Sequence, residues 1–239
     1  MKRWLNNLLI LLLLLWTLPT VAESLRVNSD WLNQNLAKEK LVIVDTRPIE
    51  DYELGHIPGA ISLPDNLTYQ HKEQSGQIVE PNIIQNILRE RGIDTESFVV
   101  VYDDGSLVDA ARVFWTLEVY GLRQVRVLNG GFADWQAKKL TVNTDTPKVE
   151  TSNYVVRIDH RRIASKFSTR LATINPNQRV IDARSEKAYR GEVSTAERFG
   201  HIPTAINISV HQHFEQQAAN GKHLLPIDEL REIYKDVPK

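Results

Sequence analysis

A motif that occurs twice constrains the fold of this chain more than any other feature. Asp-x-Arg stands at 45–47 and again at 182–184, each time directly after a short apolar run. Each copy is followed by Gly-His-Ile-Pro-x-Ala-Ile, at 55–61 and at 200–206, with a longer spacing in the second copy. Self-similarity over this distance indicates an internal duplication. The chain is therefore expected to contain two related structural units.

Uninterrupted apolar runs predict the fold class. Such runs occur at 41–44 and 98–102, and two further short strands are expected at 60–63 and 125–128. Continuous rather than alternating apolarity is typical of strands in a parallel sheet, which helices cover on both faces. Apolar periodicity predicts helices at 81–91 and from 110 to about 121. Because strands and helices alternate, the predicted class is α/β, with parallel sheets flanked by helices.

The first residues have the pattern of a secretory signal peptide. Lys2 and Arg3 precede the apolar run 8–15, and small residues ending at Ala22 form a candidate cleavage site. The run is shorter than the roughly 20 residues that a transmembrane span needs, which disfavours the alternative of a membrane anchor. We expect residues 1–22 to be removed, leaving a periplasmic or secreted protein with no stable membrane anchor.

Composition shifts divide the remaining chain. Residues 23–139 form the first predicted unit, and 140–154 have lost periodicity around Pro147 and are interpreted as a linker. Residues 155–239 repeat the first unit as far as a helix expected from Pro226. The strand, loop and helix that follow the corresponding helix in the first unit have no counterpart in the second. We therefore expect the second unit to be incomplete and poorly ordered.

A polar turn between the strand at 98–102 and the following helix is the candidate site of the first unit. A loop that leads from a parallel strand into a helix directs backbone N–H groups towards one point, which favours an anion. Asp109 is expected to be the N-cap of that helix. The acidic side chains of the loop argue against an anionic ligand. The candidate binding residues are Asp103, Asp104, Gly105, Ser106, Leu107 and Val108.

The two motif copies, together with Leu128-Asn129-Gly130-Gly131-Phe132 and Trp135, resemble the tandem-domain rhodanese-like sulfurtransferases that act on thiosulfate or 3-mercaptopyruvate. The resemblance covers nearly all of 23–239 and implies two rhodanese-like domains. In that family a cysteine after the central strand carries a persulfide sulfur, and the first domain is usually silent, with aspartate in the cysteine position. The resemblance therefore implies that Asp103 stands in that position and that the working cysteine would follow Lys239.

The chain contains no cysteine. A carboxylate cannot hold a sulfane sulfur, so we assign no catalytic residue and expect no transfer to a thiophile such as cyanide by these residues. A phosphatase-like reaction on this type of fold is disfavoured for the same reason. The resemblance implies that Arg184 contributes to binding a small sulfur-containing anion. The alternative is a non-catalytic module that binds an anion or a protein through the loop 103–108.

Other polar residues have structural interpretations. A carboxylate and a guanidinium at a strand end commonly fix a turn, and His56 and His201 recur in both copies, which favours a structural role over catalysis. His211, His213 and His223 lack the close spacing of a metal site, so neither a metal nor another cofactor is expected. With 29 basic and 30 acidic residues and a net charge of −1, no nucleic-acid partner is predicted.

Overall fold

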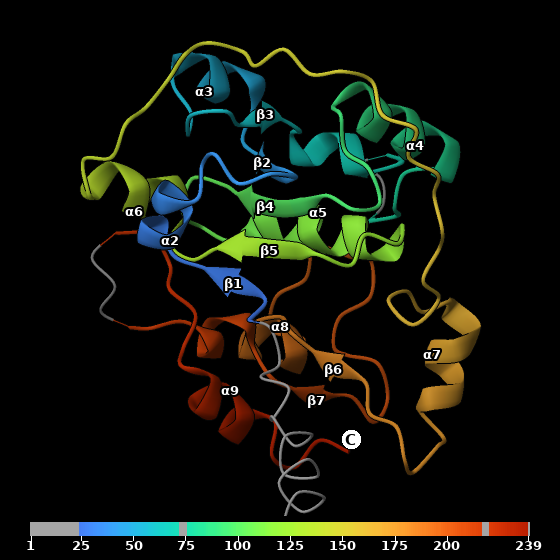
Figure 1. The fold of residues 1–239 in the computed structure, drawn as a ribbon. Helices are drawn as coiled ribbons and strands as arrows, with labels where there is room; N and C mark the ends of the chain where they lie inside the picture. The colour runs from blue at the N-terminus through green and yellow to red at the C-terminus, as the bar shows by residue number, and fades with distance from the viewer. Residues whose placement is uncertain (1–23, 72–75, 217–219, 239) are drawn as a thin grey trace, which may run out of the picture.

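The computed structural model describes residues 24–71, 76–216 and 220–238. The predicted signal peptide lies outside this part of the chain. Within it, no helix has the length and apolarity needed to cross a membrane. The described residues form a larger and a smaller unit, one above the other in Figure 1.

The larger unit is built on a parallel sheet of five strands in the order β1-β5-β4-β2-β3. Its strands are β1 (Arg26–Val27), β2 (Leu41–Asp45), β3 (Ile61–Ser62), β4 (Phe98–Tyr102) and β5 (Val125–Leu128). The parallel sheet predicted from continuous apolarity is confirmed, and β4 and β5 have the predicted limits. The two-residue β1 was not predicted, because it is a strand only through its pairing with β5.

Helices cover both faces of this sheet (Figure 1). Val99 and Val101 of β4 pack with α4 (Pro81–Glu90) and α5 (Val108–Val119) on one face. Val100 and Tyr102 pack with α2 (Ser29–Gln34) and α6 (Gly131–Ala137) on the other. Burial on both sides explains why β4 is apolar at successive positions. The helical elements of this unit are α2 (Ser29–Gln34), α3 (Ile49–Leu54), the 3-10 turn η1 (Asp65–Thr68), α4 (Pro81–Glu90), α5 (Val108–Val119) and α6 (Gly131–Ala137).

The predicted linker is an extended strap that packs on the larger unit. Residues 140–154 contain no helix or strand, and in Figure 1 they form most of the long yellow path from α6. The His56 amide donates to the Asn143 carbonyl at 2.8 Å. Tyr154 is 1% exposed within the core, and its hydroxyl donates to the Tyr120 carbonyl. The core of the first unit therefore extends beyond the expected boundary at 139.

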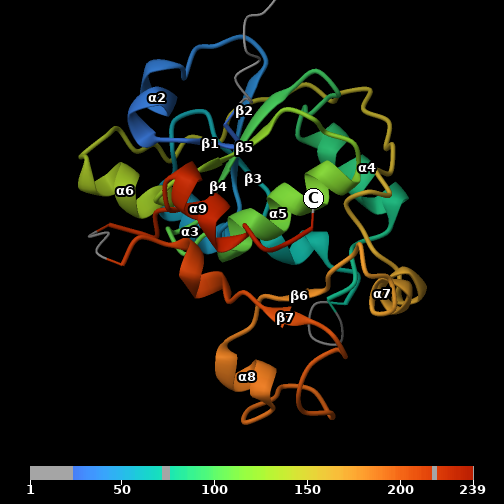
Figure 2. The ribbon, with the colours of Figure 1, turned by 90° about the horizontal axis from the view of Figure 1, so that it is seen from below.

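The smaller unit repeats the beginning of the larger one. Strands β6 (Ile181–Asp182) and β7 (Ile206–Asn207) form a two-stranded parallel sheet. They pair at the motif positions at which β2 and β3 pair within the five-stranded sheet. In the view of Figure 2 this sheet lies between α5 and α8 (Glu186–Arg190). Its other elements are α7 (Lys166–Ala172), α8 (Glu186–Arg190), the 3-10 turn η2 (Val210–His213) and α9 (Ile227–Ile233).

Corresponding residues are far more exposed in the smaller unit. Ile57 is fully buried, whereas its counterpart Ile202 is 46% exposed. In the larger unit β2 pairs with both β3 and β4, but among the described residues β6 pairs only with β7. The second copy thus presents apolar side chains and a strand edge that the first copy buries.

Candidate functional site

Asp103 is the centre of the predicted site. Its own carboxylate occupies the point on which backbone N–H groups of the loop converge, which we call the N–H nest. The residue follows the central strand β4 and is fully buried. One carboxylate oxygen accepts from the amides of Gly105 and Leu107 at 2.9 and 3.1 Å, and the other accepts from the amide of Ala110 at 3.2 Å. The converging N–H groups expected from the sequence are present. The group that these N–H groups bind is the side-chain carboxylate of Asp103, a residue of the loop itself.

This arrangement also corrects the expected start of the helix. Helix α5 begins at Val108, and the cap position is Leu107 in the left-handed region at φ 61°, so Asp109 is not the N-cap. Asp103 supplies the capping acceptor from outside the helix, because it binds the amide of Ala110 in the first turn. The sequence rule failed here because the acceptor lies four residues before the cap position.

Gly130 and Gly131 let α6 lie directly against this loop. The Phe132 amide donates to the Asp103 carbonyl at 2.8 Å. A Cβ on Gly131 would lie 2.6 Å from the Gly105 nitrogen, so a side chain cannot be accommodated there. Helix α6 was not predicted, although the paired glycines were part of the motif. Their role is close backbone approach at a positive φ.

A segment of the smaller unit covers the other side of the loop. The Lys222 amide donates to the Gly105 carbonyl at 2.7 Å, and the Lys222 carbonyl accepts from the Gly130 amide at 3.2 Å. Arg26 binds the carbonyls of Leu224 and Leu225 at 2.6 and 2.8 Å. These contacts between distant segments had no recognisable signal in the sequence. Of the six candidate loop residues, Asp103, Gly105 and Leu107 are buried, Ser106 is half-buried, and Asp104 and Val108 are exposed.

The first Asp-x-Arg motif forms a buried ion pair that fixes a turn. Arg47 binds Asp45 at 2.6 Å and also donates to the Gly55 carbonyl at 2.7 Å. Burial acts against the charged guanidinium, but the hydrogen bond and charge of Asp45 outweigh it and raise the pKa of Arg47. Tyr102 donates to Asp45 at 2.6 Å, and burial followed by the Asp45 charge raises the pKa of this phenol. This geometry supports the structural interpretation.

The second motif repeats the same contacts at the surface. Arg184 binds Asp182 at 2.6 Å and donates to the Gly200 carbonyl at 2.8 Å, and its hydrogen bond lowers the pKa of Asp182. The Arg184 side chain is 46% exposed, against 8% for Arg47. The side-chain partners of Arg184 all belong to the smaller unit, and the structure does not bring it together with the loop 103–108.

The two histidines of the repeated motif have matching structural contacts. His56 Nδ1 lies 2.9 Å from the Tyr52 carbonyl, and its ring stacks on that tyrosine at 3.9 Å between centroids. His201 has the same relation to Tyr189, with 2.8 Å and 3.8 Å. A geometry that is shared by both copies supports a loop-fixing role for these side chains.

Comparisons with known proteins agree with this architecture. A protein-family model described as "Rhodanese-like domain" matches residues 28–138. The chain is 26% identical over 196 residues to the 3-mercaptopyruvate sulfurtransferase of Escherichia coli (strain K12), covering 76% of this chain and 70% of that protein. It is 30% identical over 191 residues to the putative thiosulfate sulfurtransferase SseA of Mycobacterium bovis, covering 76% and 64%. The chain belongs to the rhodanese-like sulfurtransferase family.

The rhodanese-like architecture extends into the smaller unit. The crystal structure of SseA from Escherichia coli matches with a TM-score of 0.77 and 26% identity, over 90% of this chain and 84% of that one. The family model by itself matches only the larger unit. This rhodanese-like chain has no cysteine among its 239 residues. The nest in its first unit holds the carboxylate of Asp103, the residue type that the resemblance implied for the cysteine position of a silent first domain.

Proposed function

We propose that this chain is an exported member of the sulfurtransferases that move sulfane sulfur from thiosulfate or 3-mercaptopyruvate to a thiophile such as cyanide, and that these 239 residues do not themselves catalyse the transfer. The observation that carries the proposal is the Asp103 carboxylate in the N–H nest. With thiosulfate, a thiolate attacks the outer sulfur, sulfite leaves with the electron pair of the broken S–S bond, and a thiophile then removes the sulfur and regenerates the thiolate. These 239 residues contain no such thiol, and alone they are inactive.

The alternative function is a binding module without catalysis. For an anionic ligand, the nest that follows β4 is not vacant, because the amides of Gly105, Leu107 and Ala110 are bound to Asp103. The segment at Lys222 also covers this loop. A protein partner is compatible with the exposed side chains of Asp104 and Val108. The anion-binding form of the alternative is therefore the less favoured one.

The direct test is sulfur transfer by the purified chain. Thiocyanate formation from thiosulfate and cyanide should not exceed the rate in buffer. The Escherichia coli 3-mercaptopyruvate sulfurtransferase, assayed with its own donor, is the positive control for the reagents. Turnover by the cysteine-free chain that disappears in Arg184→Ala would contradict the proposal. Calorimetry with thiosulfate, sulfite and sulfate tests the alternative function. A module that binds anions should bind at least one of these three in a saturable way.

A second variant tests whether Asp103 occupies the sulfur position. In Asp103→Cys, a thiolate next to the amides of Gly105, Leu107 and Ala110 should have a lowered pKa and should gain the mass of one sulfur atom from thiosulfate. Alkylation by iodoacetamide is the control for access to the thiol. A thiol that is alkylated in this variant but never gains sulfur would argue against the assignment.

The proposal includes export from the cytoplasm, which rests on the sequence of residues 1–22 alone. Expression in a bacterium followed by mass measurement of the mature protein checks it. A product that begins after Ala22 is expected. A protein that retains residues 1–22 in the cytoplasm would contradict this part of the proposal.

A further inference from the structure

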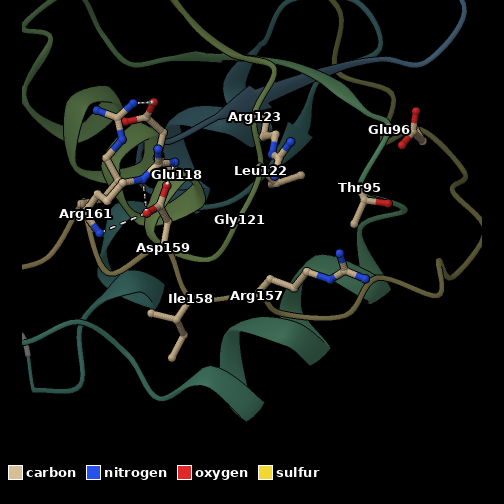
Figure 3. A pocket seen from close by; sticks show the side chains of 11 residues that line it. Thr95, Glu96, Glu118, Gly121, Leu122, Arg123, Arg157, Ile158, Asp159 and Arg161 are labelled. Atoms are coloured by element: carbon tan, nitrogen blue, oxygen red, sulfur yellow. Dashed lines mark hydrogen bonds and ion pairs between the residues drawn. The ribbon is translucent and has the colours of Figure 1, made fainter.

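A polar groove of about 900 Å³ lies at the opposite end of the sheet from Asp103. It forms where the turns that precede β4 and β5 meet residues 157–162, which follow the strap, whereas Asp103 follows β4. Four arginines and three carboxylates contribute to its walls (Figure 3). The groove is thus separate from the candidate site and net positive. Its charged lining residues are Glu96, Glu118, Arg123, Arg157, Asp159, Arg161 and Arg162.

Two of the arginines are already neutralised by neighbouring carboxylates. Arg162 binds Glu118 at 3.0 Å, and Arg161 binds Asp159 through two hydrogen bonds of 2.9 and 2.7 Å. Burial raises the pKa of Glu118, while Arg162 acts in the opposite direction. The wall that carries Glu118 is therefore partly dehydrated, which strengthens interactions between charges there.

Arg123 and Arg157 are the cations that remain available. Both residues are exposed, and in the described part of the chain neither guanidinium has a hydrogen bond or an ion pair. In Figure 3 the two side chains stand on separate sides of the opening above and below Gly121. Their charges do not converge on one point, so a single small ion would not engage both. A ligand with several acidic groups along its length would.

The backbone that carries Arg157 is held in place before any ligand binds. Its amide donates to the Tyr120 carbonyl at 3.1 Å, and the Asp159 amide donates to the Val119 carbonyl at 2.7 Å. Gly121 permits this approach, because a Cβ there would lie 2.5 Å from the Arg157 carbonyl oxygen. A fixed backbone lowers the entropy lost on binding.

We propose that this groove binds an extended acidic segment of a partner protein, with carboxylates of the segment paired to Arg123 and Arg157. The charge complementarity argues for an acidic ligand, and the separation of the two guanidinium groups argues for an extended one. The net charge of −1 for the whole chain disfavours nucleic acid as the occupant. This inference does not depend on the proposed sulfurtransferase role.

The test measures fluorescence anisotropy of a labelled, short Glu-rich peptide with the full chain. The Arg123→Ala/Arg157→Ala variant should bind at least about tenfold more weakly, because two charge-assisted contacts are lost. Affinity should also fall as ionic strength is raised from about 0.05 M to 0.5 M. Arg179→Ala/Arg198→Ala, outside the groove, is the control with the same change in net charge and should bind as the wild type does.

Three outcomes would overturn the proposal. One is equal binding of the Glu-rich peptide and its Gln counterpart. Another is equal loss of affinity in the two double variants, which would indicate a nonspecific charge effect. The third is tighter binding of a single-stranded RNA oligonucleotide than of the acidic peptide. Unchanged circular dichroism spectra of both variants exclude misfolding as the cause of any loss.

Discussion

At the scale of single residues, Asp103 shows how an N–H nest can be stabilised without a ligand. Its carboxylate is fully buried and accepts three backbone hydrogen bonds and one from the Ser106 hydroxyl. A buried charge needs such compensation, because an unpaired carboxylate in the interior is strongly unfavourable. The position was recognisable from the sequence. Its self-contained bonding was not, because it depends on the path of the loop.

We predict that Asp103→Ala destabilises the protein by about 2–3 kcal/mol, because buried amides lose their acceptor. Asp103→Asn, which retains one carbonyl acceptor, should lose less. Urea unfolding measures both changes. The matched control is Asp104→Ala, an exposed neighbour whose carboxylate accepts from the Ser106 amide, with an expected change within about 0.5 kcal/mol. Equal losses at 103 and 104 would contradict the structural role of the nest.

The repeated Asp-x-Arg motif provides a comparison of the same contacts in two environments. Arg47→Ala should cost about 3–5 kcal/mol, because it leaves the buried Asp45 carboxylate without its cation. Arg184→Ala should cause a smaller loss, because the Arg184 side chain is 46% exposed and water already weakens its ion pair with Asp182. Chemical denaturation of the two variants side by side checks the ranking. A larger loss at Arg184 would mean that the second unit carries more of the stability than its exposure suggests.

At the scale of elements, the strap at 140–154 carries a buried tyrosine in a segment that resembles a linker in composition. Without helical or strand periodicity, the sequence indicated only a connection. Tyr154 nevertheless closes the core beside α5, with its hydroxyl on the Tyr120 carbonyl. Elements with strong periodicity, such as α4 and β4, were predicted well, because their burial follows from local pattern. The position of the strap depends instead on contacts with residues of the same chain that lie far from it in the sequence.

The strap predicts a loss of stability in alkaline solution. Burial, with a smaller contribution from Tyr120, raises the pKa of Tyr154 from 10.0 to about 12. The folded state thus favours the neutral phenol, so this stabilisation is complete below pH 10 and is lost as the pH rises through about 12. Urea unfolding across this range should show the loss, and Tyr154→Phe should show a smaller one. An identical pH dependence in the variant would exclude Tyr154 as a contributor.

At the scale of the whole molecule, the two copies of the duplicated motif differ in what covers them. In the larger unit β4 and the helices on both faces enclose β2, and Val44 is fully buried. In the smaller unit Ile181, in the same motif position, is 36% exposed, and β6 has β7 as its only sheet neighbour among the described residues. Stability is therefore expected to be unequal between the units.

Hydrogen exchange should report this inequality. Amides of β2 should be protected close to the limit set by global unfolding, and amides of β6 should exchange much faster, because few apolar contacts oppose local opening. Mass spectrometry on peptides that cover 41–45 and 180–182 measures the two rates in one sample. Equally strong protection in both strands would refute the prediction that the second unit is poorly ordered.

The sequence by itself determined the α/β class, the duplication, the central strands and the position of Asp103. Each of these follows from residue type or local periodicity, which a chain carries before it folds. Only the tertiary structure decided that Asp103 fills its own nest, that the strap belongs to the first core and that Lys222 covers the loop. The first feature depends on the path of the loop, and the other two are contacts between segments that lie far apart in the sequence. Neither a loop path nor a distant contact has a recognisable pattern in composition or spacing.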